Sequence, residues 1–141
     1  MADSTDGPGV HVPPPFFYVA AIGGGVARVV AAWLFVALFL VLLLWSFAWF
    51  ARQKTTVIPD KPATALVLDG PFRLTRNPLY VAMALLTIGA GLWLNTWWVL
   101  ILLAPALLAV DRLVIAREEA YLRRRFGAEY EAYTVRVRRW L

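Results

Sequence analysis

Two long segments of this sequence carry almost no charge, and they constrain the fold more than any other feature. Residues Phe16 to Phe50 are apolar apart from Arg28, and no Asp, Glu, Lys or Arg occurs between Asn77 and Asp111. The second segment is long enough for a helical hairpin that enters and leaves a bilayer core of about 30 Å. Hydrophobic residues make up 61% of the chain, against roughly 45–50% in soluble domains. The sequence therefore excludes a soluble globule and predicts a membrane protein.

We expect an all-α, integral membrane helical bundle with three to four transmembrane helices. The first apolar segment would form about 50 Å of helix, which is too long for one perpendicular span. We therefore expect the glycine triplet Gly23–Gly25 to break it. If residues 16–29 also cross the membrane there are four spans, and otherwise three. The expected spans are residues 30–50, 78–94 and 97–115.

Local signals set the remaining boundaries. Asn77 is a candidate N-cap with Pro78 at the first helical position, and Asn95-Thr96 forms a tight turn between two spans. After the last span the pattern becomes amphipathic, Gly127 offers a helix stop, and a short helix follows at about residues 128–135.

The chain thus divides into a tail and one domain. Residues 1–15 are polar and rich in Pro and Gly, which is typical of a disordered tail, and residues 16–141 form a single membrane domain. In this domain a cytoplasmic loop is expected over residues 51–76 and amphipathic cytoplasmic helices over the C-terminal cap, residues 116–141.

The positions of the charges orient the bundle. All but one of the 14 Lys and Arg residues lie in residues 52–76 or 112–139, on either side of the uncharged hairpin, so both stretches share one side of the membrane. The positive-inside tendency makes that side the cytoplasm. We expect these charges to meet membrane lipids rather than nucleic acid. The chain has no cysteine and one histidine, which excludes thiolate nucleophiles and Cys-ligated zinc.

The first candidate site precedes the second span. Arg73 and Arg76 lead into a helix start whose free N–H groups favour anions, with Tyr80 one turn further on. Arg76 could clamp a carboxylate or phosphate and Tyr80 could form a wall of the site. The alternative is that these residues are ordinary interfacial anchors.

The second candidate site is acidic. Asp111 lies within the third span, where a carboxylate is costly, and shares a helix face with Glu118, as Arg112 does with Glu119. These carboxylates could bind a cationic ligand group. The alternative is a helix end with i,i+4 pairs such as Glu119 with Arg123. We interpret the remaining basic residues as a solvated surface facing lipid headgroups: Arg123, Arg124, Arg125, Arg136, Arg138 and Arg139.

Both clusters match a known pattern. Arg76-Asn-Pro-Leu-Tyr80 resembles the Arg-(His/Asn)-Pro-x-Tyr signature of the isoprenylcysteine carboxyl methyltransferase and phospholipid methyltransferase superfamily. The superfamily ending Glu-Glu-x-x-Leu, Phe-Gly-x-x-Tyr-x-x-Tyr is similar to the segment from Glu118 to Tyr133. Two motifs in the same order and spacing are more specific than either alone.

The resemblance implies an integral membrane methyltransferase that uses S-adenosylmethionine and acts on a lipophilic small molecule or lipid. It implies a site facing the cytoplasm, and we expect a prokaryotic inner membrane location. By this similarity Arg76 would orient the cofactor or an acceptor carboxylate and so act in catalysis. The residues implied to contact the cofactor are Gly70, Asn77, Tyr80, Glu118 and Glu119.

The chain departs from the family pattern at two positions. Carboxyl methyltransferases of the superfamily generally have His where this chain has Asn77, and Gly where it has Ala82. Asn donates and accepts hydrogen bonds but is no base near neutral pH. The acceptor group stays open among a carboxylate, an amine and a thiol. The alternative function is a noncatalytic membrane protein that binds anionic lipid or a partner through its basic face.

Overall fold

The computed structural model describes residues 15–53 and 65–141, and all regular structure in these ranges is helical. The predicted all-α class is therefore confirmed. The predicted tail over residues 1–15 lies outside the described residues except for Pro15, as do residues 54–64 of the predicted loop over residues 51–76. The elements are α1 (Pro15–Arg52), the 3-10 helix η1 (Gly70–Arg73), α2 (Pro78–Trp93), α3 (Trp97–Val110), the π-helical turn η2 (Asp111–Ile115), α4 (Ala116–Phe126) and α5 (Ala128–Arg136).

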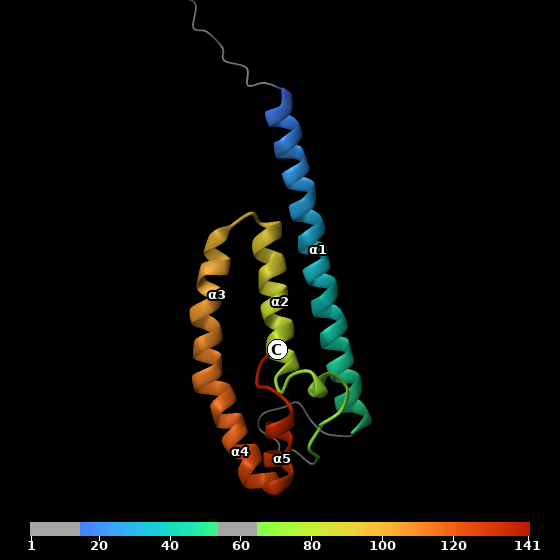
Figure 1. Cartoon of the computed structure of the whole chain (residues 1–141), viewed down its shortest axis with the longest axis vertical. Helices are drawn as coiled ribbons and strands as arrows, with labels where there is room; N and C mark the ends of the chain where they lie inside the picture. The colour runs from blue at the N-terminus through green and yellow to red at the C-terminus, as the bar shows by residue number, and fades with distance from the viewer. Residues whose placement is uncertain (1–14, 54–64) are drawn as a thin grey trace, which may run out of the picture.

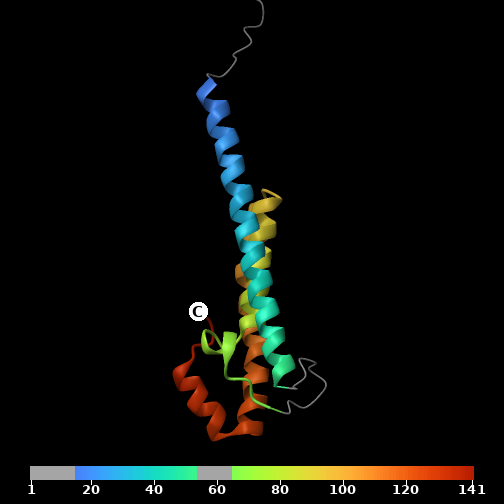
Figure 2. The same ribbon diagram turned by 90° about the vertical axis from the view of Figure 1, so that its right-hand side faces the viewer.

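Three long helices lie side by side, with α2 between α1 and α3 (Figure 1). The α2–α3 turn lies at one end of this bundle, which we call the hairpin end, and α1 extends beyond it. At the opposite end, which we call the cap end, η1 packs against α1, and α4 and α5 pack against each other (Figure 2). The two segments that carry the sequence motifs therefore reach the same end of the molecule.

Helix α1 is continuous from Pro15 to Arg52, so the predicted break at the glycine triplet is wrong. The described glycines of the triplet are not sites of close packing either, because a Cβ on Gly24 or Gly25 would meet nothing within 4 Å. Glycine disfavours helix by only about 1 kcal/mol per residue, and a backbone in an apolar environment must satisfy its hydrogen bonds internally. A separate span over residues 16–29 does not occur.

Two helical segments are long and apolar enough to cross a membrane, Gly24–Arg52 and Trp97–Phe126. Helix α2 forms where the second span was predicted. It has only 16 residues, which is about 24 Å of helix. Large apolar side chains on α1 and α3 are exposed, among them Leu44 and Leu102. Exposed apolar helix surfaces of this kind suit contact with lipid.

Glycine brings α1 and α2 close together. A Cβ built on Gly89 would lie 3.1 Å from the backbone oxygen of Ala32 and 3.2 Å from Val36. Near the hairpin end, Trp33 and Trp93 pack edge to face with ring centroids 5.1 Å apart. The absence of a side chain at Gly89 thus permits the close approach of α1 and α2.

A π-helical turn joins α3 to α4 and changes which residues share a face. In an uninterrupted α-helix Asp111 would face the same way as Glu118, seven residues later. A π turn accommodates one extra residue, so the face shared with Asp111 passes to Glu119. The predicted pairing of Asp111 with Glu118 is therefore wrong by one residue.

The buried core of the cap lies between α5 and the segment before α2. Val67, Phe72, Tyr130 and Tyr133 are buried together, and the Tyr133 hydroxyl donates a 2.7 Å hydrogen bond to the Phe72 carbonyl oxygen. The helix stop predicted at Gly127 is confirmed, with φ of 52°, and α5 follows it as expected.

Candidate functional site

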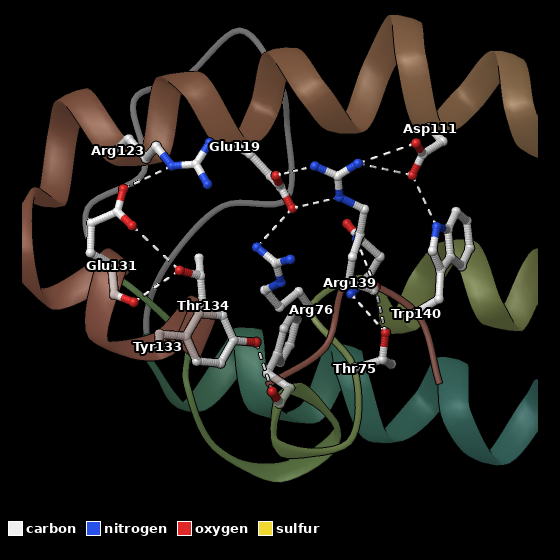
Figure 3. A network of polar contacts seen from close by, with 12 residues as sticks. Thr75, Arg76, Asp111, Glu119, Arg123, Glu131, Tyr133, Thr134, Arg139 and Trp140 are labelled. Carbon is white, nitrogen blue, oxygen red and sulfur yellow. Dashed lines mark hydrogen bonds and ion pairs between the residues drawn. The ribbon is translucent and has the colours of Figure 1, made fainter. Parts of the chain in front are cut away.

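The two motif segments meet through a buried ion pair. Arg76 comes from the turn that precedes α2, and Glu119 from the first turn of α4. The Arg76 Nη1 atom lies 3.0 Å from Oε1 of Glu119, and the two side chains are 13% and 4% exposed. Figure 3 shows these side chains pointing toward one another between α4 and the segment before α2.

Arg139 extends this pair into a chain of alternating charges (Figure 3). Its Nη2 lies 2.6 Å from Glu119 Oε2, and its Nη1 lies 3.2 Å from Asp111 Oδ2. The Trp140 indole N–H donates to the other Asp111 oxygen at 2.9 Å. The hydrogen bond to Glu119 raises the pKa of Arg139 above its usual value. Two carboxylates and two guanidinium groups balance, which limits the cost of removing them from water.

The end of the chain is held in place by its backbone. We call residues 137–141 the C-terminal strap. The Arg76 N–H donates to the Arg138 carbonyl oxygen at 3.0 Å, and the Arg139 carbonyl oxygen accepts from Thr75 Oγ1 at 2.9 Å and Asn77 Nδ2 at 3.0 Å. The strap therefore lies on the segment before α2 and carries the Arg139 guanidinium to the two carboxylates.

Asn77 occupies the N-cap position of α2, as predicted, but its side chain makes no capping hydrogen bond. Its amide instead fixes the strap, which gives the residue a structural function. Tyr80 and Glu118 form a separate contact, in which the Tyr80 hydroxyl lies 3.3 Å from Glu118 Oε1 at an exposed position.

Gly70 lies away from this network. Its φ of +65° favours glycine, and a Cβ at this position would overlap the indole ring of Trp49 on α1. Gly70 thus lets η1 pack against α1.

An open groove of about 800 Å³ adjoins the charged network. One wall is formed by apolar side chains of α3 and the other by the polar groups of the network. Its lining residues are Arg76, Ala104, Leu107, Leu108, Asp111, Arg139 and Trp140. The groove can therefore hold a molecule with both a charged and an apolar part.

Arg76 lines the groove, and its guanidinium group is not saturated with acceptors. Its buried Nε and Nη1 atoms form no well-oriented hydrogen bond among the described residues, although Nη1 lies in the ion pair with Glu119 and the Tyr130 hydroxyl interacts with the same side chain. Buried donors without acceptors are costly. An anionic ligand group would satisfy them.

The buried tyrosines beside Arg76 stay protonated. Burial raises the pKa of Tyr130, the Glu119 carboxylate adds to the shift, and Arg76 opposes it. Burial also raises the pKa of Tyr133. Both hydroxyls are therefore neutral donors at physiological pH.

Comparison with known proteins identifies the family. The family model "phospholipid methyltransferase" matches residues 27–129, well over half of the chain. The chain belongs to this family. It is also similar to an uncharacterized protein of Haemophilus influenzae, at 36% identity over 63 residues that cover 45% of this chain and 100% of that protein. No solved structure matches.

The match to phospholipid methyltransferases contains the first motif and the second motif as far as Gly127, whereas Tyr130 and Tyr133 lie beyond it. The structure brings Arg76 to Glu119 and Tyr80 to Glu118, and it places Asn77 under the strap. Arg123, the alternative partner of Glu119, pairs with Glu131 at 2.8 Å instead.

The strap lies beyond the residues matched by the phospholipid methyltransferase model, and sequence analysis missed its function. Arg139 was expected on a solvated surface, which is wrong, whereas Arg136 and Arg138 are exposed as predicted. One signal pointed to it: Asp111 and Glu119 are two carboxylates at or near membrane depth, and such groups need a cationic partner.

Proposed function

We propose that this chain is an S-adenosylmethionine-dependent methyltransferase that modifies a lipophilic acceptor at the membrane. The observation that carries the proposal is the junction of the Arg76 segment with Glu119 beside a mainly apolar groove that charged side chains border. Membership of the phospholipid methyltransferase family supports the reaction class.

The residues of the groove fit the cofactor. S-adenosylmethionine has a carboxylate, an ammonium group and a sulfonium centre, and when bound it supplies an activated methyl group. The Arg76 guanidinium group, which lines the groove, would pair with the carboxylate. Glu118 and Glu119, with Tyr80 beside them, would hold the cationic and polar groups of the cofactor. Gly70 and Asn77 would set the shape of the segment around it.

The acceptor would bind along the apolar wall of the groove. Ala104, Leu107 and Leu108 lie on α3, in a segment apolar enough for a membrane, so a lipid chain could reach the groove sideways. Methyl transfer needs chiefly alignment of donor and acceptor, which can be worth about 7–11 kcal/mol. No nucleophilic side chain is required. The acceptor group is a carboxylate, an amine or a thiol.

We further propose that α1, α2 and the α3–α4 segment all cross the membrane and that the cap end faces the cytoplasm. The basic residues of α4, α5 and the strap gather at the cap end, which supports this orientation by the positive-inside tendency. A prokaryotic inner membrane would place the groove on the side where the cofactor is made.

Titration of the full chain in detergent with S-adenosylhomocysteine tests the proposal. We expect a 1:1 isotherm that is lost in Glu119→Gln, which keeps the shape of the side chain but removes its charge. The matched control is Glu131→Gln, which alters an exposed ion pair of the same cap and should bind normally. A flat isotherm for the wild type would contradict the proposal and favour a noncatalytic lipid-binding protein.

The acceptor can then be identified directly. Methyl-labelled cofactor incubated with the protein and a bacterial lipid extract should give a labelled lipophilic product, absent with Glu119→Gln. Absence of any labelled product despite cofactor binding would contradict the proposed acceptor class.

A further inference from the structure

Arg28 is a charged residue with no compensating charge near it among the described residues. It lies on α1 beside residues of the α2–α3 turn, at the hairpin end. The facing helices α2 and α3 contain no acidic or basic residue. Among the described residues, no acidic side chain lies at this end of the bundle.

Arg28 lines a small space together with residues of the α2–α3 turn. Its Nη1 atom is buried and has no hydrogen-bond partner among the described residues. Arginines near a membrane surface normally extend the charged group into water. A buried guanidinium donor without an acceptor costs free energy, so this position favours a partner from outside the described residues.

A small cavity of about 30 Å³ lies beside Arg28. It is bounded by Gly91, Asn95, Thr96 and Trp97, the residues of the α2–α3 turn and the start of α3. A space of this size admits one oxygen atom or water molecule. A larger anion could insert one oxygen here while the rest of it stayed outside.

The surroundings favour a negative oxygen rather than a neutral one. Thr96 makes no side-chain capping bond to α3, so the positive end of this helix adds to the charge of Arg28. The backbone N–H groups of Asn95 and Thr96 are bonded to α2 carbonyls, which fixes the turn. Exposed Trp93, Trp97 and Trp98 surround the turn, and such belts mark the level of lipid headgroups.

We infer that Arg28 and the α2–α3 turn form a phosphate-binding site for one phospholipid headgroup, in the leaflet opposite the cap. The phosphodiester oxygen enters the cavity and accepts hydrogen bonds from the guanidinium group. The lipid thereby joins α1 to the hairpin at the end of the bundle that has no polar network of its own. This site is independent of the proposed methyl transfer.

Native mass spectrometry of the detergent-solubilised protein tests this inference, with dioleoylphosphatidylglycerol as the probe. We expect one lipid to bind wild-type protein about tenfold more tightly than Arg28→Gln, the loss expected when a hydrogen bond to a charged group is removed. Arg138→Gln removes one exposed cap charge and serves as the matched control, with unchanged affinity for this lipid. Equal binding by wild type and Arg28→Gln would overturn the site.

Two further arms decide the source of the phosphate. Dioleoylglycerol has the same chains without phosphate and should not bind at this position. Inorganic phosphate should not displace the bound lipid at millimolar concentration, and displacement would assign the site to soluble phosphate and overturn the lipid. Circular dichroism and S-adenosylhomocysteine titration of Arg28→Gln should match the wild type, which shows that the helices and the cap remain intact.

Discussion

The two ends of the bundle handle charge in opposite ways. At the cap end, Arg76, Glu119, Arg139 and Asp111 compensate one another within the chain. At the hairpin end, Arg28 has no such partner within residues 15–53 and 65–141. A self-compensated network can be buried in advance of a ligand and then exchange contacts with it, whereas an isolated cation depends on a ligand from outside. The cap end is therefore held together by ion pairs between side chains, whereas the hairpin end is held together by the packing of its helices.

The largest effect should follow from removing the centre of the cap network. Glu119→Ala leaves the Arg76 and Arg139 guanidinium groups without their shared carboxylate, and we expect a loss of about 3–5 kcal/mol in stability. Thermal or denaturant unfolding in detergent measures it. Glu131→Ala breaks an exposed pair and should cost about 0–1 kcal/mol. Equal losses in the two variants would show that the buried network is no more important than a surface ion pair.

Removing the bridging cation should have a smaller effect. Arg139→Ala deletes hydrogen bonds to Glu119 and Asp111 but keeps Arg76 as a partner of Glu119, so we expect a loss of about 2–3 kcal/mol. Arg138→Ala, next to it in the strap and exposed, is the control and should change stability by about 0.5 kcal/mol or less. If Arg138→Ala were as damaging as Arg139→Ala, the backbone of the strap and not the guanidinium would hold the cap together.

Helix packing can be tested in the same way. Gly89→Ala places a methyl group against the Ala32 carbonyl oxygen and should destabilise the protein by about 1–3 kcal/mol. Gly24→Ala meets open space on the same bundle and should be neutral or stabilising by up to about 1 kcal/mol. Unfolding of both variants in one detergent provides the measurement, and a stabilised Gly89→Ala would refute close packing of α1 and α2.

The smallest change in stability is expected at the edge of the cap. Tyr80→Phe removes one exposed 3.3 Å contact with Glu118 and should alter stability by about 0.5 kcal/mol or less. If Tyr80 touches the cofactor, affinity for S-adenosylhomocysteine should nevertheless fall several-fold. Tyr121→Phe, on the exposed surface of α4, is the matched loss of a hydroxyl and should keep that affinity.

Local sequence signals predicted the elements that local chemistry decides. Pro78 at the start of α2, the Asn95-Thr96 turn and the Gly127 stop all lie where expected, because each depends on a few neighbouring residues. The break predicted at the glycine triplet was wrong, because glycine breaks helices in water more readily than in an apolar environment.

The candidate site was predictable only in part. The family motifs indicated that Arg76 and Glu119 belong to one site, and they meet. The position of Arg139 depends on how the strap folds back onto residues 75–77, which no local pattern encodes. The identity of the carboxylate that faces Asp111 depends on the π turn, which has no recognisable sequence signal in Asp111–Ile115.

That π turn sets the rotation of the cap helix α4 relative to α3. Deleting one residue from Asp111–Ile115 would leave Glu119 seven residues after Asp111 and on the same face of an ordinary α-helix, whereas straightening the turn without a deletion would rotate α4 by about 100° relative to α3. Glu119 would then turn away from Arg139, and Glu118 would take its place. A design that joins this cap to a different membrane helix must therefore include residues 111–115, because the π turn sets which acid reaches the ligand groove.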